Sequence, residues 1–168
     1  MSSDLKLTDY VDAIKLTSKA ASRLFFLKQL RRADVPPRDL LHFYTTVVRP
    51  VLEYACPVWH SGLTIAQSDL LESVQKRGIC IVYPDADYLT SLIVAGIDTL
   101  CERREVLTAK FFKRQVLASS SLLHSLQLDR RDNDITSSLR NAKLFYSFQT
   151  LTNGFRKSFL PYCFDNYT

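Results

Sequence analysis

The sequence predicts a mainly α-helical protein, a small bundle of about five to seven helices with no substantial sheet. Three observations indicate this fold. Apolar residues recur at helical spacing along most of the 168-residue chain. Two segments, beginning at Thr64 and at Thr99, have the form of a capping box, which starts helices. The four Gly and six Pro form no Gly-rich or Pro-rich linker, so a compact chain is expected.

The first two expected helices are separated by a pair of prolines. Thr8 or Asp9 can cap a first helix that ends near Ala33. Pro37 suits the first position of a second helix, because a helix needs no backbone N–H there. That helix runs up to Pro50, which is expected to bend or restart it.

The next three helices are marked by their ends. The capping box at Thr64 opens a third helix, and the Tyr83-Pro84 pair ends it. Residues 88–95 form a short helix that Gly96 can terminate. The box at Thr99 opens a helix with one apolar and one basic face. We expect Val106, Leu107, Phe111, Phe112 and Val116 to face inward, and Arg103, Arg104, Lys110, Lys113 and Arg114 to face outward.

The helical pattern becomes weaker after residue 118. Ser-rich and Asp/Arg-rich stretches follow, with one short helix expected between them, over residues 122–128. The sequence therefore predicts a helical domain over residues 1–118 and a less ordered C-terminal extension over residues 119–168, with one or two short helices.

Basic residues are concentrated near the N-terminus. The net charge is +5, and residues 15–38 hold seven basic residues and one acid. On a helix, Lys15, Lys19 and Arg23 fall on one side, roughly opposite an apolar line. Such a stripe is a candidate contact for nucleic-acid phosphates. The alternative, a plain solvated face, has the higher base rate.

No self-sufficient catalytic site is visible in the sequence. Two-metal catalysis of nucleotide transfer needs carboxylates that hold two divalent ions, and the chain has no Asp-Asp pair. Asp85 and Asp87 follow Pro84 in a stretch typical of a solvated turn, which we favour over a metal pair. The three His residues are scattered, and His60 is interpreted as an anchor for its loop. We expect a chain that is not an enzyme on its own and has no cofactor.

Cysteine usage and the N-terminal residues indicate an intracellular chain. The four Cys show no metal-ligand spacing, so reduced and mostly buried thiols are expected. Neither a signal peptide nor a membrane-spanning stretch is expected. Among the aromatic residues, Phe43, Tyr44 and Tyr54 are interpreted as core, while Trp59 is open between a base-stacking role and the pinning of a loop.

One segment is more specific than any helical pattern. Residues 49–64 read Arg49-Pro-Val-Leu-Glu-Tyr-Ala-Cys-Pro-Val-Trp-His-Ser-Gly-Leu-Thr64, and a second string, Phe155-Arg-Lys-Ser-Phe-Leu-Pro-Tyr-Cys163, lies near the end. Both resemble the region downstream of the polymerase core in reverse transcriptases of non-long-terminal-repeat retrotransposons of jockey type. Further matching points are Gln67-Ser-Asp69, Glu72, Gln75-Lys-Arg77, Tyr83-Pro84 and Leu100-Cys-Glu-Arg-Arg104. Gly78 and Cys80 depart from the pattern, which usually has Ala and Arg there.

The resemblance implies the thumb and downstream region of an RNA-directed DNA polymerase without its catalytic palm. Such a fragment would hold an RNA template or an RNA/DNA hybrid by its backbone. Mg²⁺ would act only in a complete polymerase, with palm and fingers on a longer parent chain. The expected backbone contacts are Lys15, Lys19, Arg23, Arg31, Arg32, Lys76, Arg77, Arg103 and Arg104. The first string would have a structural role through Arg49, Pro50, Glu53, Tyr54, Cys56, Pro57, Trp59 and His60.

These expectations leave a second reading open. The chain can instead be a helical interaction module, or an inert remnant of a mobile element that binds no nucleic acid. Either reading places it inside the cell, in the nucleus or the cytoplasm.

Overall fold

A computed structural model describes residues 13–131, 144–149 and 151–168, and it confirms the mainly helical fold. Over these ranges the chain has no strand, only an isolated bridge between Arg130 and Phe145. The predicted start of the first helix at Thr8 or Asp9 lies outside the described residues.

The chain divides into two compact units. Unit 1 comprises Met1–Cys56 and Leu63–Arg104, and unit 2 comprises Pro57–Gly62 and Glu105–Thr168. This division follows compactness, and the domain boundary expected between residues 118 and 119 stays a prediction. The segment 49–64 therefore supplies residues to both units.

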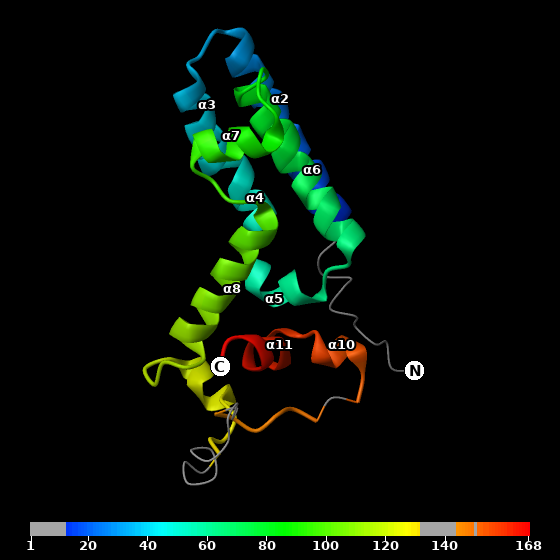
Figure 1. Ribbon diagram of the computed structural model, residues 1–168, viewed down its shortest axis with the longest axis vertical. Coiled ribbons are helices and arrows are strands. Elements are labelled where there is room, and N and C mark those ends of the chain that lie inside the picture. Colours follow the sequence, from blue (N-terminus) through cyan, green and yellow to red (C-terminus); the bar gives the residue numbers. More distant parts are fainter. Residues whose placement is uncertain (1–12, 132–143, 150) are drawn as a thin grey trace. The chain divides into compact units, whose positions relative to one another are not determined.

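Unit 1 is built on two long helices, α2 (Ala13–Arg32) and α6 (Ile65–Val82). They lie side by side and run in the same direction (Figure 1). Each helix buries apolar residues at helical spacing, as an amphipathic face requires. The buried residues are Ala20, Leu24 and Leu27 on α2 and Leu71, Val74, Ile79 and Val82 on α6.

Gly78 lets this part of the core close. A Cβ atom at Gly78 would lie 2.7 and 2.9 Å from two ring carbons of Tyr44 and 3.3 Å from a methyl carbon of Leu24. Any larger residue must push the fully buried Tyr44 ring aside. Gly78 therefore has a packing role, which its departure from the retrotransposon pattern does not indicate.

A buried to half-buried chain of hydrogen bonds links four segments of unit 1. Tyr44 Oη donates to Gln75 Oε1 at 2.9 Å, and Gln75 Nε2 donates to Tyr88 Oη at 3.1 Å. Tyr88 Oη donates to Glu72 Oε1 at 2.5 Å, and the other carboxylate oxygen of Glu72 accepts from Leu100 N at 3.0 Å. Burial raises the pKa of both phenols well above the ordinary tyrosine value.

The second expected helix is present in three consecutive pieces: α3 (Pro37–Phe43), the π-helix η1 (Tyr44–Val48) and α4 (Arg49–Glu53). The break before Pro50 has a simple cause. In a regular α-helix the ring of Pro50 would collide with the carbonyl of Thr46. The backbone widens instead, and Arg49 N donates to Tyr44 O, five residues earlier. The prediction that Pro50 bends or restarts the helix is confirmed as an interruption, and the new α-helical piece begins at Arg49.

Tyr54 departs from its predicted core position. α4 ends at Glu53, Tyr54 has an extended ψ of 123°, and Ala55 is left-handed with φ 51°. The helical spacing that predicted burial therefore stops before Tyr54, whose side chain is 73% exposed. Tyr44, three turns earlier in the same pattern, is fully buried as predicted.

The predicted start of α6 and the predicted end of α7 are confirmed. Thr64 and Gln67 form both hydrogen bonds of the capping box of α6. Helix α7 (Tyr88–Ala95) ends at Gly96, which is left-handed with φ 63°. Asp87 caps α7 by accepting from Thr90 N at 3.2 Å. The Asp87 carboxylate therefore serves as a helix cap.

Helix α8 (Leu100–Gln115) begins at the second capping box, but its buried line differs from the prediction. The fully buried residues recur every four positions: Leu100, Arg104, Thr108, Phe112 and Val116. Val106 is 56% exposed and Phe111 is 37% exposed, so their inward prediction is wrong. The line includes Arg104 and Thr108, which a rule based on apolar residues assigns to the surface.

Unit 2 packs short elements around aromatic rings. Besides the later part of α8 it includes η2 (His60–Gly62), η3 (Leu122–Leu126), α10 (Asn153–Arg156) and α11 (Phe159–Asn166). Residues Pro57–Trp59 come from the short helix α5 (Cys56–Trp59). The core residues are Phe112, Val116, Phe145, Cys163 and Phe164. Of the less ordered extension predicted after residue 118, residues 132–143 and 150 lie outside the described part.

Candidate nucleic-acid interface

The charged side chains of helix α2 are all positive. Its 20 residues include six basic residues and no acid. The exposed members are Lys15, Lys19, Lys28 and Arg32, while Arg31 is half-buried. Because no acidic side chain lies on α2 itself, an anion approaching this helix meets only positive charge from it.

Arg23 is less available than the sequence predicted. Its Nη1 donates to the carbonyl of Val47 at 2.5 Å, which ties α2 to η1 inside unit 1. The side chain is half-buried. The predicted stripe of Lys15, Lys19 and Arg23 therefore has one member whose guanidinium is engaged in the fold.

The structure adds a groove between α2 and α6 with a cation from each helix. Lys28 from α2 and Arg77 from α6 line it, and its volume is about 390 Å³. The remaining lining residues are Ala21, Leu24, Phe25, Cys80 and Ile81. Lys76, next to Arg77, is exposed. Lys28 belongs to the basic segment but was not among the predicted contacts, since only the pairing of the two helices places it opposite Arg77.

The basic residues Arg103 and Arg104 at the start of α8 have internal partners. Arg103 Nε lies 3.2 Å from Glu53 Oε1, and the same oxygen lies 3.4 Å from Arg49 Nε. Arg104 is fully buried and its Nη2 donates to Ser68 Oγ at 2.8 Å. Burial lowers the pKa of Arg104. The prediction of an outward Arg104 is wrong, and its guanidinium is not exposed to a phosphate.

The residues of the 49–64 segment have structural positions in both units. In unit 1, Cys56 is buried, and burial raises the pKa of its thiol to about 11. In unit 2, Trp59 is only 6% exposed, which removes it as an open stacking platform. Cys163 is also buried, but Cys80 and Cys101 are exposed, so the expectation of mostly buried thiols is wrong for two of the four.

His60 belongs to a polar cluster in unit 2 centred on Glu105. His60 Nε2 lies 2.5 Å from Glu105 Oε2, Tyr162 Oη donates to both carboxylate oxygens at 3.1 Å, and Tyr167 Oη donates to Oε1 at 2.6 Å. Burial alone would raise the pKa of Glu105, but the hydrogen bonds from Tyr167, His60 and Tyr162 together lower it. Sequence reasoning missed Glu105 because its partners are distant in the chain.

The Glu105 cluster joins separate segments of unit 2, because its carboxylate accepts from His60, Tyr162 and Tyr167 at once. Among the described residues no group of His, Cys, Asp or Glu could hold a metal ion. None of the helices that the structure describes is long and apolar enough to span a membrane.

Comparison with known proteins gives no relative for this chain. No family model, no curated protein and no solved structure matches it.

Proposed function

We propose that this chain is a non-catalytic helical module that binds the backbone of an RNA/DNA hybrid or RNA template, as the C-terminal fragment of an RNA-directed DNA polymerase of a mobile element. The binding surface consists of the exposed basic residues of α2 together with Lys76 and Arg77 of α6. Chemistry belongs to a palm on a longer parent chain. The resemblance of residues 49–64 to retrotransposon reverse transcriptases motivates the assignment.

The observation that carries the proposal is the pairing of Lys28 and Arg77 across one groove. Two cations on adjacent parallel helices can each contact a phosphate, and neither helix places an acid in that lining. Binding of this kind reads the shape and charge of a duplex and not its base sequence. The free energy comes largely from released counterions, so it falls with salt.

A salt titration with a labelled RNA/DNA hybrid tests the proposal. Neutralising both groove cations, Lys28→Gln with Arg77→Gln, should remove two phosphate contacts and lower the slope of log K against log salt by about 2. The matched control is Lys113→Gln with Arg114→Gln, an exposed pair on α8 in unit 2. It changes the net charge equally and should leave the slope nearly unchanged.

Equal losses in the two double variants would contradict a localised interface, because they would show that only net charge matters. Absence of binding by the unaltered chain at about 50 mM salt would reject the proposal altogether.

A second candidate function is protein interaction through α7. Leu89, Ile93 and Val94 of this short helix are 65%, 81% and 65% exposed. An apolar group of this kind is typical of a contact surface. If the chain is a helical interaction module, Ile93→Ser should reduce its self-association or partner binding in sedimentation and leave hybrid binding unchanged.

A further inference from the structure

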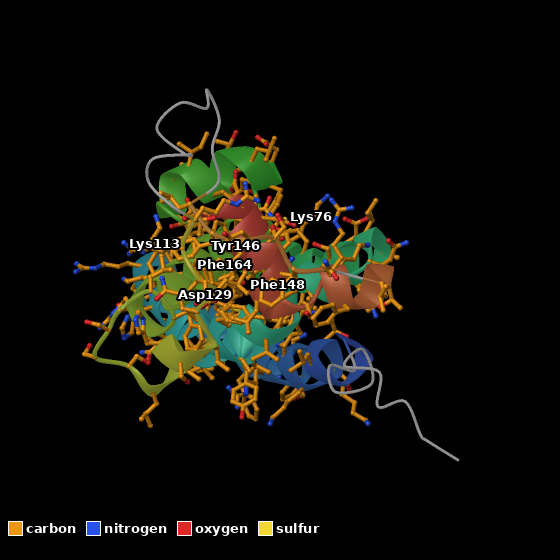
Figure 2. The ribbon with its side chains drawn as sticks, turned by 90° about the horizontal axis from the view of Figure 1, so that it is seen from below. Lys76, Lys113, Asp129, Tyr146, Phe148 and Phe164 are labelled. Carbon is orange, nitrogen blue, oxygen red and sulfur yellow. The ribbon has the colours of Figure 1, made fainter. Side chains whose placement is uncertain are left out.

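Unit 2 contains a second groove whose lining differs from that of the α2–α6 groove. It has a volume of about 290 Å³, near the lower end of the roughly 300–1,000 Å³ that holds small ligands. Its walls come from residues 145–148 and from the C-terminal helices, and Figure 2 shows Tyr146, Phe148 and Phe164 grouped together. The lining combines aromatic rings with one cation and one carboxylate: Phe145, Tyr146, Ser147, Phe148, Arg156, Pro161, Phe164 and Asp165.

The aromatic rings have different degrees of exposure. Phe145 and Phe164 are buried and meet edge to face with ring centroids 5.1 Å apart, so they form the floor of the groove. Phe148 is half-buried, and its ring lies 5.8 Å from Phe164. Tyr146 is 54% exposed and offers ring surface to solvent.

Tyr146 is held in place from the backbone and from one neighbouring cation. Tyr146 N donates to Asp129 O at 3.3 Å, and Arg131 N donates to Leu144 O at 2.9 Å, which pairs the two segments. The Arg131 guanidinium lies 5.5 Å from the centre of the Tyr146 ring, a cation–π contact. A positioned ring that is more than half exposed is suited to stacking against a flat ligand.

Charge at the groove selects the kind of flat ligand. Arg156 is exposed at the lining and can contact a phosphate. Asp165 on α11 lines the same groove. An aromatic surface next to a basic residue is the usual combination in proteins that bind single-stranded nucleic acid.

We propose that this groove binds one unpaired nucleotide of a single-stranded nucleic acid, with the base stacked on Tyr146 and Phe148 and its phosphate at Arg156. The site goes beyond the proposed duplex interface, because its residues belong to unit 2 and bind a base that is not paired. It does not depend on Lys28 or Arg77.

The test uses the full chain and a labelled single-stranded oligouridine of about ten nucleotides. Tyr146→Ala should weaken binding about 5-fold to 150-fold, the loss found when one stacking residue is removed. Tyr146→Phe keeps the ring and should bind as the unaltered chain does. The matched control is Phe26→Ala, an aromatic of similar exposure, 58%, on α2 in unit 1, which should leave single-strand binding unchanged.

A covalent readout locates the base independently. Irradiation of the chain with an oligouridine that contains 5-iodouridine should cross-link the peptide that includes residues 144–149, as mass spectrometry can show. Loss of cross-linking at this peptide in Tyr146→Ala supports the site. Equal affinity of Tyr146→Ala and the unaltered chain, or cross-links only to unit 1 peptides, overturns it.

The two proposals fail separately. The groove variants Lys28→Gln and Arg77→Gln are measured with the hybrid, and Tyr146→Ala with the single strand. A chain that binds the single strand but not the hybrid would contradict only the duplex interface in unit 1. A chain that binds the hybrid but not the single strand would contradict only the nucleotide groove in unit 2.

Discussion

The two units are stabilised in different ways. Unit 1 depends on the close approach of long helices, with Gly78 directly under the Tyr44 ring. Unit 2 has short helices of four and eight residues after α8, too short to be stable by themselves. Its stability comes from rings that meet edge to face and from one carboxylate that accepts from three side chains.

This difference indicates where each unit is most sensitive to substitution. In unit 1, added side-chain volume at the helix contact should lower the stability. In unit 2, the loss of an aromatic ring or of the Glu105 charge should lower the stability instead. Trp59, the only tryptophan of the chain, belongs to unit 2, so its fluorescence reports on that unit. Far-UV circular dichroism reports mostly on the long helices.

The largest effect is expected from removing the central ring of unit 2. Phe112 is fully buried, and its ring centroid lies 5.0 Å from Phe164 and 6.3 Å from Phe159. Phe112→Ala should lower the free energy of unfolding by about 3–5 kcal/mol, because it leaves a cavity among rings. Denaturant titration followed by Trp59 fluorescence measures the loss. The neighbouring Phe111, 37% exposed, is the control, and an equal loss in Phe111→Ala would contradict a core centred on Phe112.

The next effect tests the helix contact of unit 1. Gly78→Ala gains about 1 kcal/mol of helix propensity, but its Cβ would lie 2.7 Å from a carbon of the buried Tyr44 ring. Overpacking of this kind costs about 1–3 kcal/mol, so we expect a net loss of stability. Gly154→Ala in α10 is the control, since nothing lies within 4 Å of its Cβ position. Thermal unfolding by circular dichroism distinguishes them, and a stabilised Gly78→Ala would show that the helices have room to separate.

Local signals in the sequence predicted much of unit 1. The capping box at Thr64, the proline at residue 37 and the glycine at residue 96 each act within one helical turn, so the chain shows them without its fold. The π-helix before Pro50 and the exposure of Tyr54 were not predicted. The π-helix depends on how the backbone accommodates Pro50, and the exposure of Tyr54 depends on the end of α4 at Glu53. The apolar pattern of the sequence shows neither.

The features of the candidate sites that the sequence did not predict depend on contacts between residues far apart in the chain. Tyr162 and Glu105 are 57 residues apart, and no spacing rule connects them. Arg104 is buried because it continues a line set by Leu100 and Phe112, although its charge suggests an exposed position. Lys28 and Arg77 form one groove only after α2 and α6 pair. The basic segment was visible in the sequence, whereas the selection of its members required the fold.

A smaller loss of stability is expected at acid pH, mainly in unit 2, where the Glu105 carboxylate accepts hydrogen bonds. The folded-state pKa of Glu105 is lowered, so its contribution is present above the ordinary glutamate value and is lost as the pH falls through the folded value. Glu105→Gln should cost about 1–2 kcal/mol at neutral pH and flatten this acid dependence. Unfolding curves by Trp59 fluorescence between neutral pH and about pH 3 measure both. An unchanged acid dependence in the variant would show that another carboxylate is responsible.

The smallest effect compares one helix cap in each unit. Thr64 caps the 18-residue α6, and Gln67 N donates to its Oγ1 at 3.2 Å. Thr152 caps the four-residue α10 with the same geometry, Phe155 N donating at 3.2 Å. Thr64→Ala should cost about 1 kcal/mol, since α6 is packed against α2 and its loss affects all of unit 1. Thr152→Ala should cost about half as much or less, because every residue of α10 is exposed, and its opening removes the Phe148–Phe155 ring contact but none of the buried core rings. Denaturation midpoints of the two variants measure the difference, and equal losses would mean that α10 unfolds together with the aromatic core and not ahead of it.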